Sequence, residues 1–493
     1  MGASEPVILA VDLGTSGVKV VLIGRAGRVR ATATVDYPIE ADGATGAAEQ
    51  DPETWWSALV AATRRACAAV ASDGGPGHSP EIAAICVVGQ GPTLVASDAL
   101  GRATHPAITW MDGRLATEAT ELEAATGMSG WELGVLPAAR WLERHGEPAA
   151  VAGTRWYLNA WEWAALRLGG VAATTRTFGR DLPDASRVAA TGLEVRRLAP
   201  VIDVGAVVGR LGPLPAAELG LAPGLPVVAG PNDAFASFHG AGLLDAGDAV
   251  DTGGSSGGLA VYWDGPIDVP GAWVGHAPLA DRWVVGGAMT ATGTALDWLA
   301  SSVLGGSATP DTLIGEAAGI APGADGLVFL PYLAGERSPI WDPGARGAFV
   351  GLSLAHGRAH LARAVLEAAA LALRHVAAPI LAAGLRVDEL VVAGGTARDD
   401  TWNRIKADVL GIPVAVPAMR ETAVLGAAII GATAVGWHAD VRAAIGAMVR
   451  IDHRIEPDSA LAARYDALYA AYTGLWPAIA PTVRTLRDLP RPD

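Results

Sequence analysis

The chain contains the same turn motif twice. Residues 10–17 read AVDLGTSG and residues 249–256 read AVDTGGSS, so Ala-Val-Asp-x-Gly-x-Ser recurs in each half of the 493 residues. Solenoid and propeller repeats have periods of about 20–50 residues. A motif that recurs at a much greater distance indicates two copies of one domain. We place the boundary near Ala246, which gives domains 1–246 and 247–493. Each motif follows an apolar run, which predicts a strand that ends in a glycine turn with amides able to face an anion.

Composition and patterning define the class of protein. Strand-like and helix-like runs alternate, which predicts an α/β fold. With 51% hydrophobic and 18% charged residues the chain is expected to be globular. The net charge of −15 and the absence of basic tracts argue against nucleic-acid and membrane partners. Cys67 and Cys86 have no metal-ligand or disulfide spacing. The residues 360–385 predict a buried helix, and MGASEPVILAVD has no signal-peptide pattern, so we expect a cytoplasmic protein.

The two turns are the candidate phosphate-binding elements. A P-loop ending in Gly-Lys is absent, because Lys19 follows Val18 and Lys406 follows Ile405. Main-chain N–H groups and small hydroxyls in the turns would contact a polyphosphate, and Asp12 would face magnesium through water. The alternative for either turn alone is an ordinary tight turn, and it is the duplication that favours the phosphate role.

Several stretches together resemble one enzyme family. The duplicated turn resembles the phosphate loops of the sugar kinase, actin and chaperone ATPase superfamily. The stretches ITWMDGR (108–114), GAFVGLSLAHGRAHLARAVLE (347–367) and DELVVAGGTARDDTWNRIKADVLGIPV (388–414) resemble motifs of the FGGY carbohydrate kinases, in family order. The resemblance implies two duplicated actin-like (ribonuclease H-like) domains with a cleft between them. It also implies ATP and Mg²⁺, a small sugar or polyol substrate and a possible homodimer.

The resemblance also implies site residues. Asp233, in AGPNDAFASFHGAG (229–242), is the expected general base, with capping of a helix beginning at Ala234 as the alternative role. The expected substrate-binding residues are Gln90, Gly91, Pro92, Asp112, Arg114, Asp233 and Ala234. The expected ATP-binding residues are Asp12, Gly14, Thr15, Ser16, Gly253, Gly254, Ser255, Gly293, Thr294, Gly394, Gly395, Thr396 and Asn403. The expected magnesium-facing residues are Asp12 and Asp233.

Some positions depart from the family pattern. Gly91 and Pro92 stand where related kinases carry polar substrate-reading side chains, and Ala234 stands where Gln or Asn is common. In the second turn Asp251 stands where a small residue is usual, and Gly254 replaces a usual Thr. The resemblance implies phosphorylation of a terminal hydroxyl, with a pentulose such as D-xylulose as the leading substrate, and the altered positions leave the sugar open. Ribulose, erythritol, glycerol or gluconate remain alternatives, as do a non-catalytic sugar-binding relative and a chaperone-like or filament-forming ATPase.

Overall fold

The computed structural model describes residues 5–42, 45–74, 80–128, 130–176, 188–189, 192–277, 279, 281–487 and 489. The chain forms two compact units. Unit 1 comprises Met1–Gly242, Gly275–Asp281 and Thr422–Val449, and unit 2 comprises Leu243–Val274, Arg282–Glu421 and Arg450–Asp493. The predicted boundary near Ala246 stays a prediction, and the sequence division did not include the return of Thr422–Val449 to unit 1.

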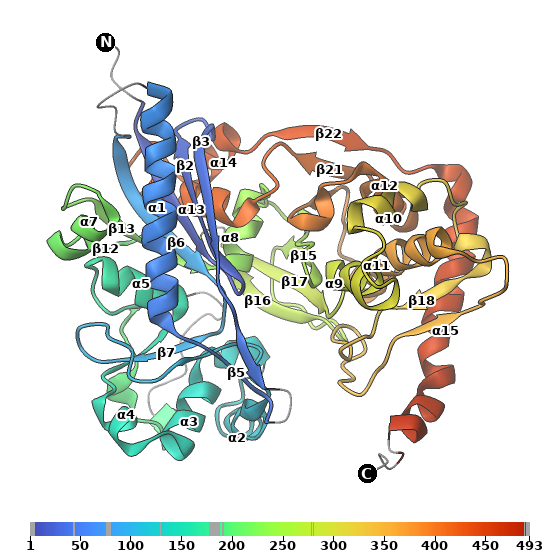
Figure 1. Ribbon diagram of the computed structural model, residues 1–493, viewed down its shortest axis with the longest axis horizontal. Coiled ribbons are helices and arrows are strands. Elements are labelled where there is room, and N and C mark those ends of the chain that lie inside the picture. Colours follow the sequence, from blue (N-terminus) through green and yellow to red (C-terminus); the bar gives the residue numbers. More distant parts are fainter. Residues whose placement is uncertain are drawn as a thin grey trace. The chain divides into compact units, whose positions relative to one another are not determined.

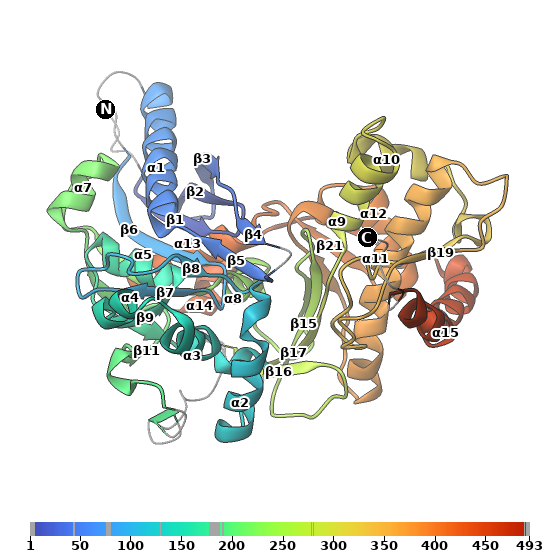
Figure 2. The same cartoon turned by 60° about the horizontal axis from the view of Figure 1, so that its bottom comes forward.

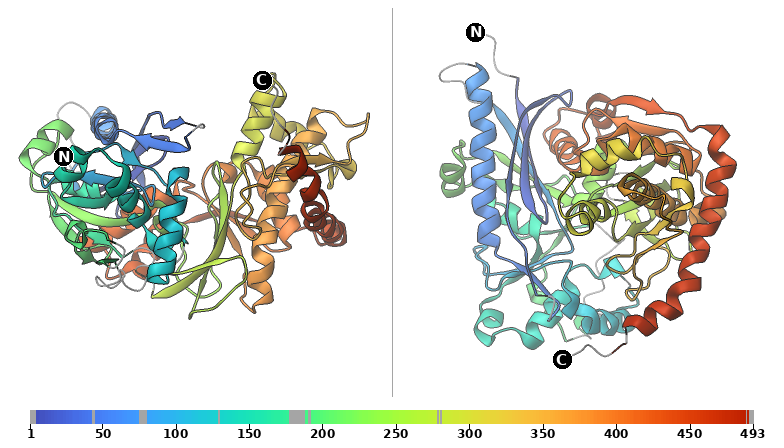
Figure 3. Two further views of the ribbon diagram at one scale, coloured as in Figure 1. Left: turned by 90° about the horizontal axis from the view of Figure 1, so that it is seen from below. Right: turned by 45° about the vertical axis from the view of Figure 1, so that its right-hand side comes forward.

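Unit 1 is built on a six-stranded sheet in the order β12-β13-β6-β1-β2-β3. These strands are Val207–Arg210, Pro226–Asn232, Ile82–Gly89, Val7–Leu13, Gly17–Gly24 and Val29–Asp36. β6 is parallel to both β1 and β13, whereas β2 is antiparallel to β1 and to β3. The central strands are almost continuously apolar because helices cover both faces of the sheet. α1 (Pro52–Gly74) lies along one face (Figure 1; Figure 3).

The opposite face is covered by α13 (Thr422–Ala434), which packs on β1 and β6 and against α8 (Asp233–Gly240). The two helix backbones touch. A Cβ on Gly240 would lie 1.9 Å from the Thr422 carbonyl oxygen, and a Cβ on Gly426 would lie 1.9 Å from that of Ala236. This close glycine packing explains why the segment 422–449 joins unit 1, and it fixes the helix that begins with Asp233.

A second sheet of unit 1 has the order β4-β5-β8-β7-β9. Its strands are Glu40–Asp42, Ala47–Gln50, Ala107–Ile108, Leu94–Ser97 and Trp156–Asn159. The remaining helices of unit 1 are α2 (Ala116–Thr126), α3 (Leu136–His145), α4 (Pro148–Gly153), α5 (Ala160–Leu168), α7 (Pro213–Leu219) and α14 (Val441–Met448). Short elements are η1 (Gly113–Leu115), η2 (Gly130–Leu133), η3 (Val195–Arg197), β10 (Thr174–Thr175) and β11 (Val201–Ile202).

Unit 2 repeats the strand arrangement of unit 1. Its main sheet has the order β16-β17-β15-β14-β20-β21-β22. These strands are Trp273–Ala277, Arg282–Met289, Gly257–Trp263, Ala249–Asp251, Leu390–Val392, Val414–Pro417 and Ile451–Ile455. The strand before each motif, β1 or β14, is antiparallel to the strand that follows it and parallel to a later strand, β6 or β20. The predicted duplicated α/β architecture is confirmed.

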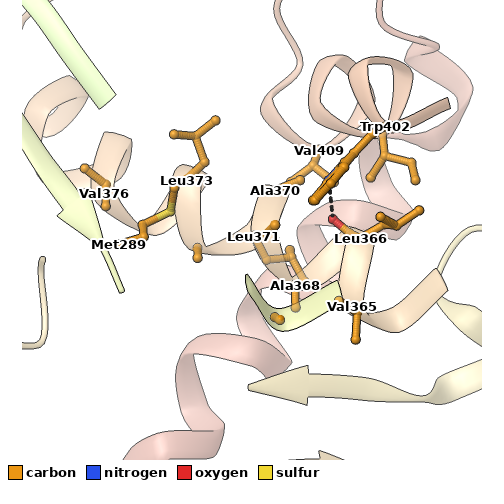
Figure 4. Packing of buried hydrophobic residues seen from close by; sticks show 14 of the residues in the cluster. Met289, Val365, Leu366, Ala368, Ala370, Leu371, Leu373, Val376, Trp402 and Val409 are labelled. Carbon is orange, nitrogen blue, oxygen red and sulfur yellow. Dashed lines mark hydrogen bonds between the residues drawn. The ribbon is translucent and has the colours of Figure 1, made fainter. Parts of the chain in front are cut away.

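The core of unit 2 surrounds α11 (Arg358–Ala382). This helix is long and apolar enough to cross a membrane by composition, but 72% of its most apolar stretch is buried inside the fold. Figure 4 shows Trp402 of α12 (Asp400–Leu410) reaching α11, where its indole N–H donates to the Leu366 carbonyl at 3.2 Å. Trp402 is therefore a core residue.

The other elements of unit 2 complete this core. α15 (Ala462–Arg487) packs on α11, α12 and β18 (Val328–Leu330) (Figure 2). The rest are α9 (Gly293–Trp298), α10 (Pro310–Ala317) and β19 (Ala348–Val350), together with a π-helix, η4 (Leu299–Val303), and three short 3-10 helices, η5 (Ala324–Gly326), η6 (Gly395–Ala397) and η7 (Ser459–Leu461).

Candidate active site

The carboxyl ends of three parallel strands of unit 1 meet at one edge of its main sheet. Leu13 of β1 and Asn232 of β13 both pair with Gly89 of β6. The segments around these residues, with Asp12 and Asp233, therefore lie at the same edge. Ligands of open α/β sheets bind outside the carboxyl ends of the strands, so this edge is the candidate site.

The first turn is held by two side chains that lie far away in the sequence. The Tyr37 hydroxyl donates to the Gly14 carbonyl at 2.6 Å, and its backbone N–H donates to the Ser16 carbonyl at 3.0 Å. Gln50 Nε2 donates to the Thr15 carbonyl at 2.8 Å. In a trans peptide the N–H points opposite to the carbonyl before it, so the N–H groups of Thr15 and Ser16 point away from these anchors. The turn can present them to an anion.

Gln50 also connects the turn to Gln90. Gln90 Nε2 donates to Gln50 Oε1 at 2.8 Å, and Gln90 is 1% exposed. The Trp110 indole N–H donates to Thr15 Oγ1 at 3.1 Å. Gln90 supports the first turn through Gln50, and the substrate contact expected of it stays a prediction. Tyr37 and Gln50 were missed because no local spacing links them to that turn.

Asp112 and Arg114 form a structural ion pair. Asp112 accepts from the N–H groups of Ala48 and Arg114, both at 3.0 Å, and from Arg114 Nε at 2.9 Å. Burial acts to raise the pKa of Asp112, yet the hydrogen bonds from Arg114 and Ala48 leave it below its usual value. Arg114 also pairs with Glu49, and its guanidinium lies 4.0 Å from the Trp141 ring centre. Both charges are thus balanced within the fold, and direct substrate contacts by Asp112 and Arg114 stay predictions.

Asp233 is the first residue of α8, and Asn232 is the N-cap. Asn232 Oδ1 accepts from the Ala234 N–H at 2.9 Å, and Asn232 Nδ2 donates to the Gly91 carbonyl at 3.2 Å. The N-cap is therefore Asn232, contrary to the alternative in which Asp233 caps a helix beginning at Ala234. The Asp233 carboxylate also accepts from the Ala234 N–H at 2.7 Å. Burial, followed by repulsion from Asp12, raises the pKa of Asp233 to about 8. The two carboxylates therefore interact.

The indole of Trp161 lies against Gly91, one of the positions that depart from the family pattern. A Cβ on Gly91 would lie 2.6 Å from Trp161 Cζ3, so the indole fills the space that a side chain there would need. The Trp161 ring is fixed, because its N–H donates to Thr175 Oγ1 at 3.1 Å and it is 2% exposed. Gly91, Pro92 and Ala234 are each partly exposed. This part of the edge presents apolar atoms and backbone rather than polar side chains.

The second turn is held by the segment that opens α9. The Gly254 carbonyl accepts from Gly293 N at 3.0 Å and from Thr292 Oγ1 at 3.1 Å. The Ser255 carbonyl accepts from Thr294 N at 3.0 Å and from Thr294 Oγ1 at 2.9 Å. The N–H groups that follow these carbonyls point the other way, as in the first turn. Gly293 and Thr294 therefore support the turn, and direct nucleotide contacts by them stay predictions.

A glycine loop lies against the second turn. Gly394 has a φ of +69°, and a Cβ there would lie 2.0 Å from the Gly253 carbonyl oxygen. Gly395 has open space around it, since its Cβ would meet nothing within 4 Å. This crowding on one side and openness on the other suits close approach of a ligand to the backbone.

Two predicted nucleotide residues are buried instead. Asn403 is 0% exposed, and its Nδ2 donates to the Ala397 carbonyl at 3.0 Å. Asn403 therefore holds the glycine loop, and its expected place near the purine stays a prediction. Thr396 is 5% exposed and accepts a hydrogen bond from Lys406, so its side chain also faces inward.

Two carboxylates are the candidate magnesium contacts. Among the described residues no group of three or more His, Cys, Asp or Glu side chains could hold a metal ion. Mg²⁺ in phosphoryl-transfer sites commonly takes one or two carboxylates together with phosphate oxygens and water, so Asp12 and Asp233 fit this pattern. Burial is the main cause of the raised pKa of Asp233, and repulsion from Asp12 adds to it; a bound cation would relieve that repulsion.

Comparison with known proteins decides the family. The description "FGGY family of carbohydrate kinases, N-terminal domain" matches residues 7–240, and its C-terminal counterpart matches residues 252–435. The chain belongs to the FGGY family of carbohydrate kinases. It is therefore a sugar kinase that uses ATP, as predicted, and not a chaperone-like or filament-forming ATPase. The homodimer and the cytoplasmic location stay predictions.

Individual relatives include kinases of different sugars. The chain is 34% identical over 431 residues to the xylulose kinase of Escherichia coli K12, covering 82% of this chain and 84% of that protein. It is 27% identical over 508 residues to the gluconokinase of Bacillus subtilis 168, covering 95% of each. A crystal structure of the xylulose kinase from Rhodospirillum rubrum matches with a TM-score of 0.79 and 30% identity, covering 97% of this chain and 100% of that one.

Proposed function

We propose that this kinase phosphorylates a terminal hydroxyl of a pentulose, with D-xylulose as the leading substrate and Asp233 as the general base. The observation that carries the proposal is the shared edge of unit 1, where Asp12 and the first turn lie at the end of β1 and Asp233 follows β13, the two strands that flank β6. The xylulose kinases among the relatives support the choice of sugar.

Charge balance favours a neutral sugar over a sugar acid. The predicted cation of the substrate region, Arg114, pairs with Asp112 and Glu49, which leaves no net positive charge there for a carboxylate. The Trp161 ring lies directly behind Gly91, so the partly exposed Gly91 and Pro92 present backbone and apolar atoms rather than polar side chains, which favours contact with the C–H groups of a sugar. Gluconate, which one relative phosphorylates according to its name, is therefore the second candidate.

The proposed reaction transfers one phosphoryl group. The sugar hydroxyl oxygen bonds to the γ-phosphorus of ATP, its proton passes to a carboxylate oxygen of Asp233, and the bond to the bridging oxygen breaks to leave ADP. Thr15 and Ser16 present N–H groups to phosphate oxygens, and Asn232 fixes the start of α8 so that Asp233 stays in place. Mg²⁺ held near Asp12 and Asp233 would supply charge neutralisation of the phosphates.

An ADP-release assay with a sugar panel tests the substrate. The panel contains D-xylulose, D-ribulose, L-ribulose, L-xylulose, glycerol, erythritol, xylitol, D-arabitol and gluconate, each with Mg-ATP. D-xylulose is expected to stimulate release most, and Asp233→Asn is expected to abolish the stimulation. Stimulation by gluconate alone would overturn the neutral-sugar argument. If no compound stimulates ADP release while ADP still binds, the result would favour the non-catalytic sugar-binding alternative.

Loosening the first turn is expected to weaken ATP use. Tyr37→Phe removes the 2.6 Å bond to the Gly14 carbonyl, and Gln50→Ala removes the bond to the Thr15 carbonyl. Loss of one such bond costs about 1 kcal/mol, so we expect KM for ATP to rise about 5-fold in each variant. Tyr472→Phe, which removes a buried hydroxyl bonded to Tyr332 in the core of unit 2, is the control. An equal rise of KM in that control would show that general softening is the cause.

A further inference from the structure

A buried ion pair lies behind the second turn. Lys406 Nζ lies 2.7 Å from Asp251 Oδ2, and both side chains are 3% exposed. Asp251 ends β14, two residues before Gly253, and Lys406 lies on α12. Charged side chains are rarely buried unless they are paired, because removal from water is costly. Lys406 is one of only two lysines in the whole sequence.

Lys406 contacts both nucleotide-side loops of unit 2. Its Nζ donates to Thr396 Oγ1 at 3.1 Å. That same oxygen lies 1.8 Å from the place where a Cβ on Gly253 would be, so Thr396 touches the second turn. One ammonium group therefore joins the end of β14, the second turn and the loop that begins at Gly394.

The charge of Asp251 explains why a lysine is needed. A carboxylate so near the second turn, without a counter-charge, would repel the phosphates of a nucleotide bound there. Lys406 cancels that charge inside the fold, where solvent does not screen it. The family resemblance implies a small residue at position 251, and an aspartate there needs a compensation that a small residue would not.

We infer that Lys406 and Asp251 act as a positioning pair for the nucleotide. The pair locks the second turn to the 394–396 loop and keeps that surface free of net negative charge. The inference rests on the use of ATP by the family and not on the identity of the sugar. Binding of ADP without any sugar therefore tests it separately from the proposed function.

A second buried ion pair of unit 2 provides a matched control. Arg363 Nε lies 2.8 Å from Glu367 Oε1, with side chains 8% and 2% exposed. Both residues lie on α11, and their further partners are Tyr465 and the Gly323 N–H rather than either nucleotide-side loop. Arg363→Met should therefore reduce stability to a similar degree without acting on the nucleotide.

The decisive measurement is the Kd for ADP by isothermal titration calorimetry, with Tm recorded for every variant. Lys406→Met is expected to weaken ADP about 30-fold or more, because it leaves Asp251 uncompensated. The double variant Asp251→Ser with Lys406→Gln is expected to recover most of the affinity. Arg363→Met is expected to lower Tm with the wild-type Kd. Wild-type Kd in Lys406→Met, or equal weakening in Arg363→Met, overturns the inference.

A second variant keeps the test sharp if Lys406→Met fails to fold. Asp251→Asn preserves the shape of the carboxylate and leaves the Lys406 charge facing the phosphates. We expect ADP to bind this variant more tightly than the wild type, because an unbalanced positive charge then lies behind the second turn. A Kd equal to that of the wild type would contradict the charge-cancelling role. In active protein, Lys406 variants are expected to raise KM for ATP while KM for the sugar stays unchanged.

Discussion

Asp233→Asn is expected to lower kcat about 10²- to 10⁴-fold, which is the usual contribution of a positioned general base. The amide cannot accept the proton of the sugar hydroxyl, whereas the backbone around it stays fixed by the Asn232 cap. ADP binding should be unchanged. Steady-state kinetics with the stimulating sugar, together with calorimetry for ADP, measure both. A variant that keeps more than a tenth of the wild-type kcat would assign the proton transfer to another group.

The same substitution is expected to stabilise the protein. Burial, with repulsion from Asp12 added, disfavours the ionised form of Asp233, which is why its pKa is raised to about 8. Folding at pH 7 therefore requires Asp233 to take up a proton or to stay charged beside Asp12, and a neutral amide of the same shape removes that cost, so the Tm measured in EDTA should rise by several degrees. Excess Mg²⁺ should reduce the difference, because a cation relieves the repulsion in the wild type. The exposed Asp203 provides the control, since Asp203→Asn should change neither Tm nor kcat.

The sequence was enough to predict the parts of the site that depend on local pattern. The two Asp-x-Gly-x-Ser motifs lie at the ends of apolar strands, as predicted, and each of these strands is parallel to a later one. The family resemblance grouped Asp12 and Asp233, and the structure adds a physical reason, because parallel strands bring their carboxyl ends to one edge of the sheet.

What the sequence did not predict depends on contacts between distant segments. The anchoring of the first turn by Tyr37 and Gln50 requires β3 and β5 to be in place first. Motif resemblance assigned Gln90 and Asn403 to ligands, but it did not predict that both side chains are buried and donate to Gln50 and to the Ala397 carbonyl. The space beside Gly91 is filled by Trp161, which lies far along the sequence, after β7, β8 and β9. No local sequence pattern predicts that a distant tryptophan fills the space of a missing side chain.

The loop after β20 allows stability and nucleotide contact to be separated with two neighbouring glycines. Gly394→Ala would place a methyl group 2.0 Å from the Gly253 carbonyl oxygen at a φ of +69°. Both the clash and the left-handed backbone oppose it, so we expect a loss of about 3 kcal/mol in the free energy of unfolding. Because the second turn must then move, ADP binding should be lost as well. Urea unfolding and calorimetry measure the two effects.

Gly395→Ala is the matched partner, because its methyl group would meet no protein atom within 4 Å. Its free energy of unfolding should stay within about 0.5 kcal/mol of the wild type, as for other substitutions free of clashes. If the nucleotide approaches the backbone here, as we predict, the methyl group occupies its space and the Kd for ADP rises about tenfold. Wild-type stability with wild-type affinity would place the nucleotide elsewhere. Loss of affinity without loss of stability would identify Gly395 as a direct contact, since in this variant the second turn has no reason to move.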